Sequence, residues 1–211
     1  METNLKKGIF YGILGTLLIG VQPIVANARP GVLDSHIFAA MTCLIEAILF
    51  LPIMFIELVR SNKNESDEAT FKIRFSNMRE NWKKNVWLLI FIGMIFGLNQ
   101  LLFFVGYGLA GSINGALTQK TTVFFSLVFG YLILKENVTK TQVVFSVILF
   151  LGLIIAITEG TFFILFDIEF SVILGVLTLL FITCLWMLGH TLTKPIFNRN
   201  EATPTQIVFV R

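Results

Sequence analysis

Histidine, cysteine and charge are all scarce in this chain of 211 residues, which has two His, two Cys and 14% charged side chains. Because His36 and His190 fall on opposite sides of the predicted membrane spans, no HxxxH-type cluster is expected near an interface. Cys43 and Cys184 stand alone in apolar runs without CxxC spacing, which is typical of small buried hydrophobes. No phosphate-binding loop or nucleotide fingerprint is found. These absences argue against a membrane-embedded enzyme and against ATP-driven transport, and no cofactor is expected.

Apolar residues are abundant instead. They make up 55% of the chain, the mean hydropathy is +0.82, and there are 22 Phe. A membrane-spanning helix needs about 20 mostly apolar residues, and several such runs are visible. Lipid then acts as the solvent for the apolar excess, and every backbone group is hydrogen-bonded inside a helix. The composition therefore predicts an all-α polytopic membrane protein.

The hydrophobic runs predict six spans and the beginning of a seventh. The predicted spans are residues 8–28, 36–59, 86–108, 112–134, 139–158 and 171–189, with a polar, basic loop at 60–85. A further helix begins near Pro204, and the sequence stops at Arg211 after barely two turns. A helix of that length is too short to cross a bilayer. We therefore expect the chain to be a truncated piece of a longer carrier.

The first run also has features of a secretory signal peptide. Ala26-Asn27-Ala28 has the A-x-A form of a cleavage site. The apolar region is longer than a signal peptide normally uses, however, and Gln22-Pro23 interrupts it. A retained helix is favoured, in which Gln22 either lines a cavity or lies near the interface.

The basic residues are distributed very unevenly between the two sides of these spans. Arg29 is on one side, and thirteen Lys and Arg residues are on the other. The thirteen are Lys6, Lys7, Arg60, Lys63, Lys72, Arg74, Arg79, Lys83, Lys84, Lys135, Lys140, Lys194 and Arg199. The positive-inside rule places the basic side, and with it the amino terminus, in the cytoplasm. We expect a multi-pass protein of the cell membrane that has the bilayer as a partner and does not bind nucleic acid.

The polar loop at 60–85 contains one apolar stripe. Phe71, Phe75, Met78 and Trp82 recur at the spacing of one helix face, with basic residues around them. This pattern favours a short helix lying on the membrane surface. A partly disordered loop is the alternative.

The fourth and fifth predicted spans resemble the EamA family of the drug/metabolite transporter superfamily. The likeness begins with the small, turn-forming segment 110–116 and continues through Gln119-Lys120-Thr121. It then includes Leu134-Lys135-Glu136 at the end of the fourth span, with Gln142 and Gly152 in the fifth. Val123 stands where the family usually has proline, and Ser146 occupies one of its glycine positions.

The resemblance implies a ten-helix carrier built from two five-helix units. Because five is odd, the second unit enters the membrane inverted, and inverted repeats give alternating access. On this reading residues 1–158 form one complete unit and residues 159–211 begin the second. The family tends to have an arginine in the second helix of each unit, where this chain has Glu46 in the first. If the chain truly ends at Arg211, a homodimer would be needed to assemble one carrier.

Polar side chains within the spans mark a candidate path for a solute. Ionisable groups at that depth are costly unless they face the bundle interior, a partner or water. The candidates for substrate binding or coupling are Lys120, Glu46, Asn99, Gln100, Gln119, Gln22, Tyr107 and Trp186. Lys120 could pair with Glu46, bind an anionic group of the substrate, or be neutral. No metal site is predicted.

These features together predict a secondary active transporter of a small metabolite or drug-like solute, with alternating access and proton or exchange coupling. A membrane scaffold or receptor that does not transport is the alternative. A membrane-embedded enzyme is the less favoured alternative.

Overall fold

The computed structural model describes residues 2–28, 30, 33–60, 68–158, 160 and 169–211. These residues form helices and no strands, so the predicted all-α fold is confirmed for them. The helices are α1 (Glu2–Asn27), α2 (Ser35–Arg60), α3 (Glu68–Lys84), α4 (Val86–Gln119), α5 (Thr122–Leu134), α6 (Lys140–Ile157), α8 (Phe170–Asn198) and α9 (Pro204–Val210). Arg29 and Lys63, which entered the charge count above, lie outside the described residues.

Five of these helices are long and apolar enough to cross a membrane, namely α1, α2, α4, α6 and α8. Much of their apolar surface points outward: Leu17 is 66% exposed, Leu44 60% and Phe145 65%. Such extensive exposed apolar surface is unfavourable in water but suits contact with lipid chains. The chain is therefore a multi-pass membrane protein.

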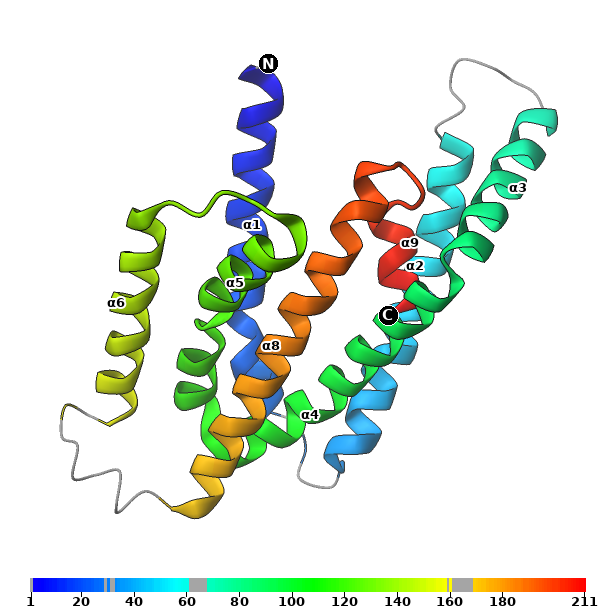
Figure 1. Cartoon of the computed structure of the whole chain (residues 1–211). Helices are drawn as coiled ribbons and strands as arrows, with labels where there is room; N and C mark the ends of the chain where they lie inside the picture. Colours follow the sequence, from blue (N-terminus) through cyan, green and yellow to red (C-terminus); the bar gives the residue numbers. More distant parts are fainter. Residues whose placement is uncertain (1, 29, 31–32, 61–67, 159, 161–168) are drawn as a thin grey trace.

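The helices form a bundle around α4 and α8, the two helices that pack together most extensively (Figure 1). Helices α1 and α2 pack against α4, α5 packs against α8, and α6 lies at one edge. The start of α1, the end of α2, the start of α3 and the α5–α6 and α8–α9 connections are at the same end, which we call the basic end. An ion pair between Lys194 and Glu136 ties the end of α8 to the α5–α6 connection there.

Glycine allows α4 and α8 to approach closely. A Cβ added to Gly106 would lie 2.8 Å from Leu179 Cγ, and one added to Gly175 would lie 2.5 Å from the backbone nitrogen of Ala110. Both distances are shorter than normal contacts, so larger residues would push the two helices apart. Small residues serve this purpose at helix interfaces in membranes, where backbones pack directly against each other.

The chain reverses direction within α4. Gly111 has φ 76° and ψ 168°, a conformation that a residue with a side chain rarely adopts. This position falls within the Gly/Ser turn expected between the spans 86–108 and 112–134. Helix α4 therefore consists of two helical segments, one on each side of Gly111.

The predicted span 112–134 is interrupted at Lys120 and Thr121, between the end of α4 and the start of α5. The hydroxyl of Thr118 donates to the carbonyl of Asn114 at 2.7 Å, and that of Thr121 donates to the carbonyl of Thr118 at 2.7 Å. Thr122 bonds in the same way to Gln119. Hydroxyls that bond back to preceding carbonyls often bend helices. The threonine-rich sequence thus accounts for a break that apolar periodicity does not reveal.

Helix α3 forms over the apolar stripe of the 60–85 loop. Met78 is buried and Trp82 is half-buried, so this stripe faces the protein at its carboxyl-terminal end. The Trp82 ring stacks on Phe209 of α9, with 6.3 Å between ring centroids. Figure 1 shows α3 running on roughly along the line of α4. The placement of α3 on a membrane surface stays a prediction.

Candidate functional site

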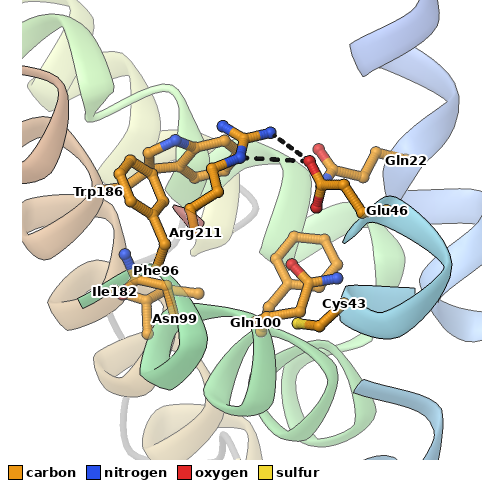
Figure 2. A pocket seen from close by; sticks show the side chains of 10 residues that line it. Gln22, Cys43, Glu46, Phe96, Asn99, Gln100, Ile182, Trp186 and Arg211 are labelled. Atoms are coloured by element: carbon orange, nitrogen blue, oxygen red, sulfur yellow. Dashed lines mark hydrogen bonds and ion pairs between the residues drawn. The ribbon is translucent and has the colours of Figure 1, made fainter. Parts of the chain in front are cut away.

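A central cavity of about 250 Å³ lies where α1, α2, α4, α8 and α9 meet (Figure 2). Its lining residues are Gln22, Cys43, Glu46, Phe96, Asn99, Gln100, Phe103, Ile182, Trp186 and Arg211. Polar and charged groups thus face one another among aromatic walls. Solute sites in proteins commonly combine an apolar lining with a few convergent polar groups.

An ion pair crosses this cavity between α2 and the end of α9. Nη2 of Arg211 donates to Oε1 of Glu46 at 2.8 Å, and Nε of Arg211 donates to the same oxygen at 3.2 Å (Figure 2). The guanidinium also lies over the Phe96 ring, 5.3 Å from its centroid. The side chain of Arg211 is 28% exposed and that of Glu46 is 31% exposed, so both remain accessible from the cavity. Their opposite charges neutralise each other.

The amide of Asn99 has no hydrogen-bond partner among the described residues. The residue is 6% exposed, and both its amide nitrogen and its amide oxygen are buried. The indole nitrogen of Trp186 is likewise buried without a partner there. A buried polar group without a partner costs about 1–3 kcal/mol. Gln100 differs, because its Nε2 donates to the hydroxyl of Thr42 at 3.0 Å.

A second cavity of about 350 Å³ lies between α1, the end of α4, α5 and α8. Lys120 and Gln119 line it together with His190, and Trp186 lines both cavities. The Trp186 ring stacks on His190, with 6.1 Å between centroids. The indole therefore forms part of the wall between the two spaces.

The structure divides the eight predicted site residues among three environments. Five of them line the central cavity: Gln22, Glu46, Asn99, Gln100 and Trp186. Gln119 and Lys120 line the second cavity. Tyr107 is completely buried and lines neither; its hydroxyl donates to Oε1 of Gln119 at 3.1 Å, and its ring packs on Gly115. Tyr107 thus positions Gln119 from behind the cavity wall.

Of the three roles considered for Lys120, the ion pair with Glu46 is not the one that the structure shows. Lys120 lies in the second cavity, whereas the guanidinium that pairs with Glu46 belongs to Arg211. Periodicity cannot select between two cations that are distant in the chain. The resemblance to the EamA family holds a signal for Arg211, because family members tend to have an arginine in the second helix of each unit and residues 204–211 would begin that helix in the second unit. Cys43, which the sequence predicts to be a small buried hydrophobe, also lines the central cavity.

A separate polar cluster fixes the start of α9 at the basic end. Glu201, with 8% of its side chain exposed, accepts hydrogen bonds from Lys84 at 2.6 Å, Asn85 at 3.0 Å and Arg199 at 3.0 Å. These bonds, with Lys84 contributing most, lower the pKa of Glu201 to about 2. Nearby, the hydroxyl of Thr203 donates to Glu57 at 3.0 Å. We call these five residues and Glu57 the Glu201 cluster.

The model of the EamA-like transporter family matches residues 6–158. The chain belongs to the EamA-like transporter family. An uncharacterized transporter, YyaM of Bacillus subtilis (strain 168), is 37% identical over 81 residues, which are 37% of this chain and 26% of that protein. The matched region thus spans about a quarter of the relative's length. No solved structure gave a significant match to the chain.

Proposed function

We propose that this EamA-like chain belongs to a secondary active transporter in the cell membrane, and that its central cavity binds a small polar solute. Family membership and the multi-pass fold support transport, and the relative that matches the chain is named as a transporter. The observation that carries the proposal is the pair of Asn99 amide atoms, buried beside the cavity without a partner among the described residues. A bound solute would supply the missing hydrogen bonds.

The cavity limits the class of solute. Its volume of about 250 Å³ is small compared with typical drug-sized sites of about 300–1,000 Å³. Amides from Gln22, Asn99 and Gln100 offer both donors and acceptors. A small metabolite with several hydrogen-bonding groups fits this lining better than a large apolar drug.

The Glu46–Arg211 ion pair suggests how binding would be coupled to movement. It joins α2 of the predicted first unit to α9 of the predicted second unit. In the proposed mechanism of alternating access, the two units rock against each other around the cavity. The ion pair would then open and close once per cycle. Glu46 is the only carboxylate among the lining residues that the structure describes, and we assign proton or exchange coupling to it.

We place the amino terminus in the cytoplasm as part of the same proposal. The α5–α6 connection with Lys135 and the α8–α9 connection with Arg199 share the basic end of the bundle, and Lys84 pairs with Glu201 of the latter connection. The positive-inside rule assigns such an end to the cytoplasm.

Proteoliposomes loaded with a defined mixture of small polar metabolites would test the proposal. The compounds lost over time are measured by mass spectrometry, with the protein expressed from its whole coding region. At least one compound should leave faster than from protein-free liposomes, and Arg211→Gln should slow it by about tenfold. Lys140→Gln, which removes a charge at an exposed site on α6, is the matched control. Transport is rejected if no compound leaves faster. If Arg211→Gln behaves like Lys140→Gln, the cavity is rejected.

A further inference from the structure

A groove of about 710 Å³ lies on the outer side of the bundle near the basic end, bounded by α2, α3, α4 and α9. It is separate from the central cavity and shares no lining residue with it. Most of its lining is apolar, contributed by side chains such as Met54, Phe75 and Ile90. Among the described residues that line it, two are charged, Arg79 and Lys83, and both are basic.

The basic pair stands on the α3 side of the groove. Arg79 and Lys83 are four residues apart on α3, so they lie on the same face of that helix. Both are exposed, and neither has an ion-pair partner among the described residues. Two cations without an ion-pair partner in the described part of the chain, placed beside an apolar groove, are complementary to a molecule with an anionic head and a hydrocarbon tail.

The part of the groove between the basic pair and Gly93 is as long as one leaflet of a bilayer is thick. From Lys83 its wall continues along α4 to Gly93, ten residues further along the chain. At about 1.5 Å per residue this distance is about 15 Å, half of a hydrocarbon core about 30 Å thick. Figure 1 shows that α3 and α4 follow nearly the same line over this region.

Aromatic residues support the placement of Arg79 and Lys83 at the membrane interface. Trp82 lines the groove, and Trp87, one turn further along the chain, is 83% exposed. Tryptophan is enriched where hydrocarbon meets lipid head groups. The basic pair is therefore at the depth of the phosphate groups.

We propose that this groove is a binding site for one anionic phospholipid. The phosphate lies between Arg79 and Lys83, and an acyl chain follows the apolar wall toward Gly93. Basic pockets between membrane helices bind anionic head groups in this way. The bound lipid would also pack against Phe209 and Val210 of α9, which line the inner side of the groove. This site is independent of the proposed transport activity.

Fluorescence quenching by brominated lipid would test this site. In a Trp87→Phe/Trp186→Phe background, Trp82 is the remaining tryptophan and lines the groove. The protein is reconstituted in phosphatidylcholine vesicles that contain increasing fractions of dibromo-phosphatidylglycerol or dibromo-phosphatidylcholine. We expect half-maximal quenching at a much lower fraction of the glycerol lipid. Each basic residue should contribute about fivefold to this preference.

Three double variants make the test specific. Arg79→Gln/Lys83→Gln should remove the preference for phosphatidylglycerol, while Arg79→Lys/Lys83→Arg should keep most of it. Lys135→Gln/Lys140→Gln removes two charges from the α5–α6 connection at the same end of the molecule and should leave the preference unchanged. Circular dichroism confirms that each variant is folded. Equal quenching by both lipids would overturn the proposal, as would an equal loss of preference in the α5–α6 variant.

Discussion

The central cavity and the Glu201 cluster both bring charged and polar side chains of different helices together, but the two regions differ in how many of these groups have hydrogen-bond partners. Glu201 receives three hydrogen bonds and is largely buried. In the cavity, Asn99 has no partner among the described residues, and Glu46 and Arg211 remain about 30% exposed. Complete pairing is what a fixed structural contact requires, because any change leaves a buried charge alone. Incomplete pairing leaves capacity for a ligand.

The two regions also act on the same helix. The Glu201 cluster holds the beginning of α9 against α2 and the α3–α4 junction, and the Glu46–Arg211 ion pair holds its end. We therefore expect the cluster to act as a fixed point and the ion pair as the contact that a solute or a proton can change.

The largest effect should come from Glu46→Gln. The substitution leaves Arg211 without a carboxylate partner and removes the group assigned to coupling. We expect flux to fall about tenfold, equivalent to about 1.4 kcal/mol, and its response to an imposed pH gradient to disappear. Proteoliposome flux with and without the gradient measures both. Glu169→Gln, at an exposed site outside the cavity, is the control. A pH-dependent flux that survives in Glu46→Gln would assign coupling elsewhere.

For Glu201→Gln we expect a loss of stability with little change in flux. This variant leaves Lys84 and Arg199 without their shared carboxylate, so the melting temperature in detergent should fall by a few degrees. Flux per folded molecule should stay close to that of the wild type. The matched control is Glu80→Gln, at an exposed position on α3. The contrast between the two regions fails if Glu201→Gln melts like its control, or if it loses flux without losing stability.

The smallest expected effect is the pH dependence of the stability that Glu201 contributes. Because the pKa of Glu201 is lowered to about 2 in the folded protein from an ordinary value of 4.5, its contribution to stability is complete above about pH 4.5. That contribution is lost as the pH falls from about 4.5 toward 2. The difference in melting temperature between wild type and Glu201→Gln should therefore be constant from pH 8 to pH 5 and shrink below it. A difference that shrinks between pH 8 and pH 5 would contradict this.

Much of the architecture could be predicted because lipid imposes simple rules on sequence. Long apolar runs predicted a multi-pass helical protein, and the polar residues within them pointed to Asn99, Gln100 and Glu46, which the structure brings to one cavity. Such residues stand out because a polar group is costly in hydrocarbon.

The pairing of side chains could not be predicted in the same way. Glu46 and Arg211 are 165 positions apart, and their contact depends on how α9 packs between α2 and α4. Similarly, Tyr107 has a hydroxyl that could bind a ligand, but its ring packs closely against Gly115 and the residue is buried in the packed interior. Both facts follow from helix packing, which hydrophobic periodicity does not specify.

The effect of Asn99→Leu on flux and stability tests the central claim most directly. If the Asn99 amide exists to bind solute, replacing it with an apolar side chain of similar size removes an unsatisfied polar group. The melting temperature in the absence of solute should then stay the same or rise, by the equivalent of about 1–3 kcal/mol at most. The flux of the transported compound should fall at least tenfold in the same preparation. Flux equal to that of the wild type would contradict the assignment of the central cavity as the solute site.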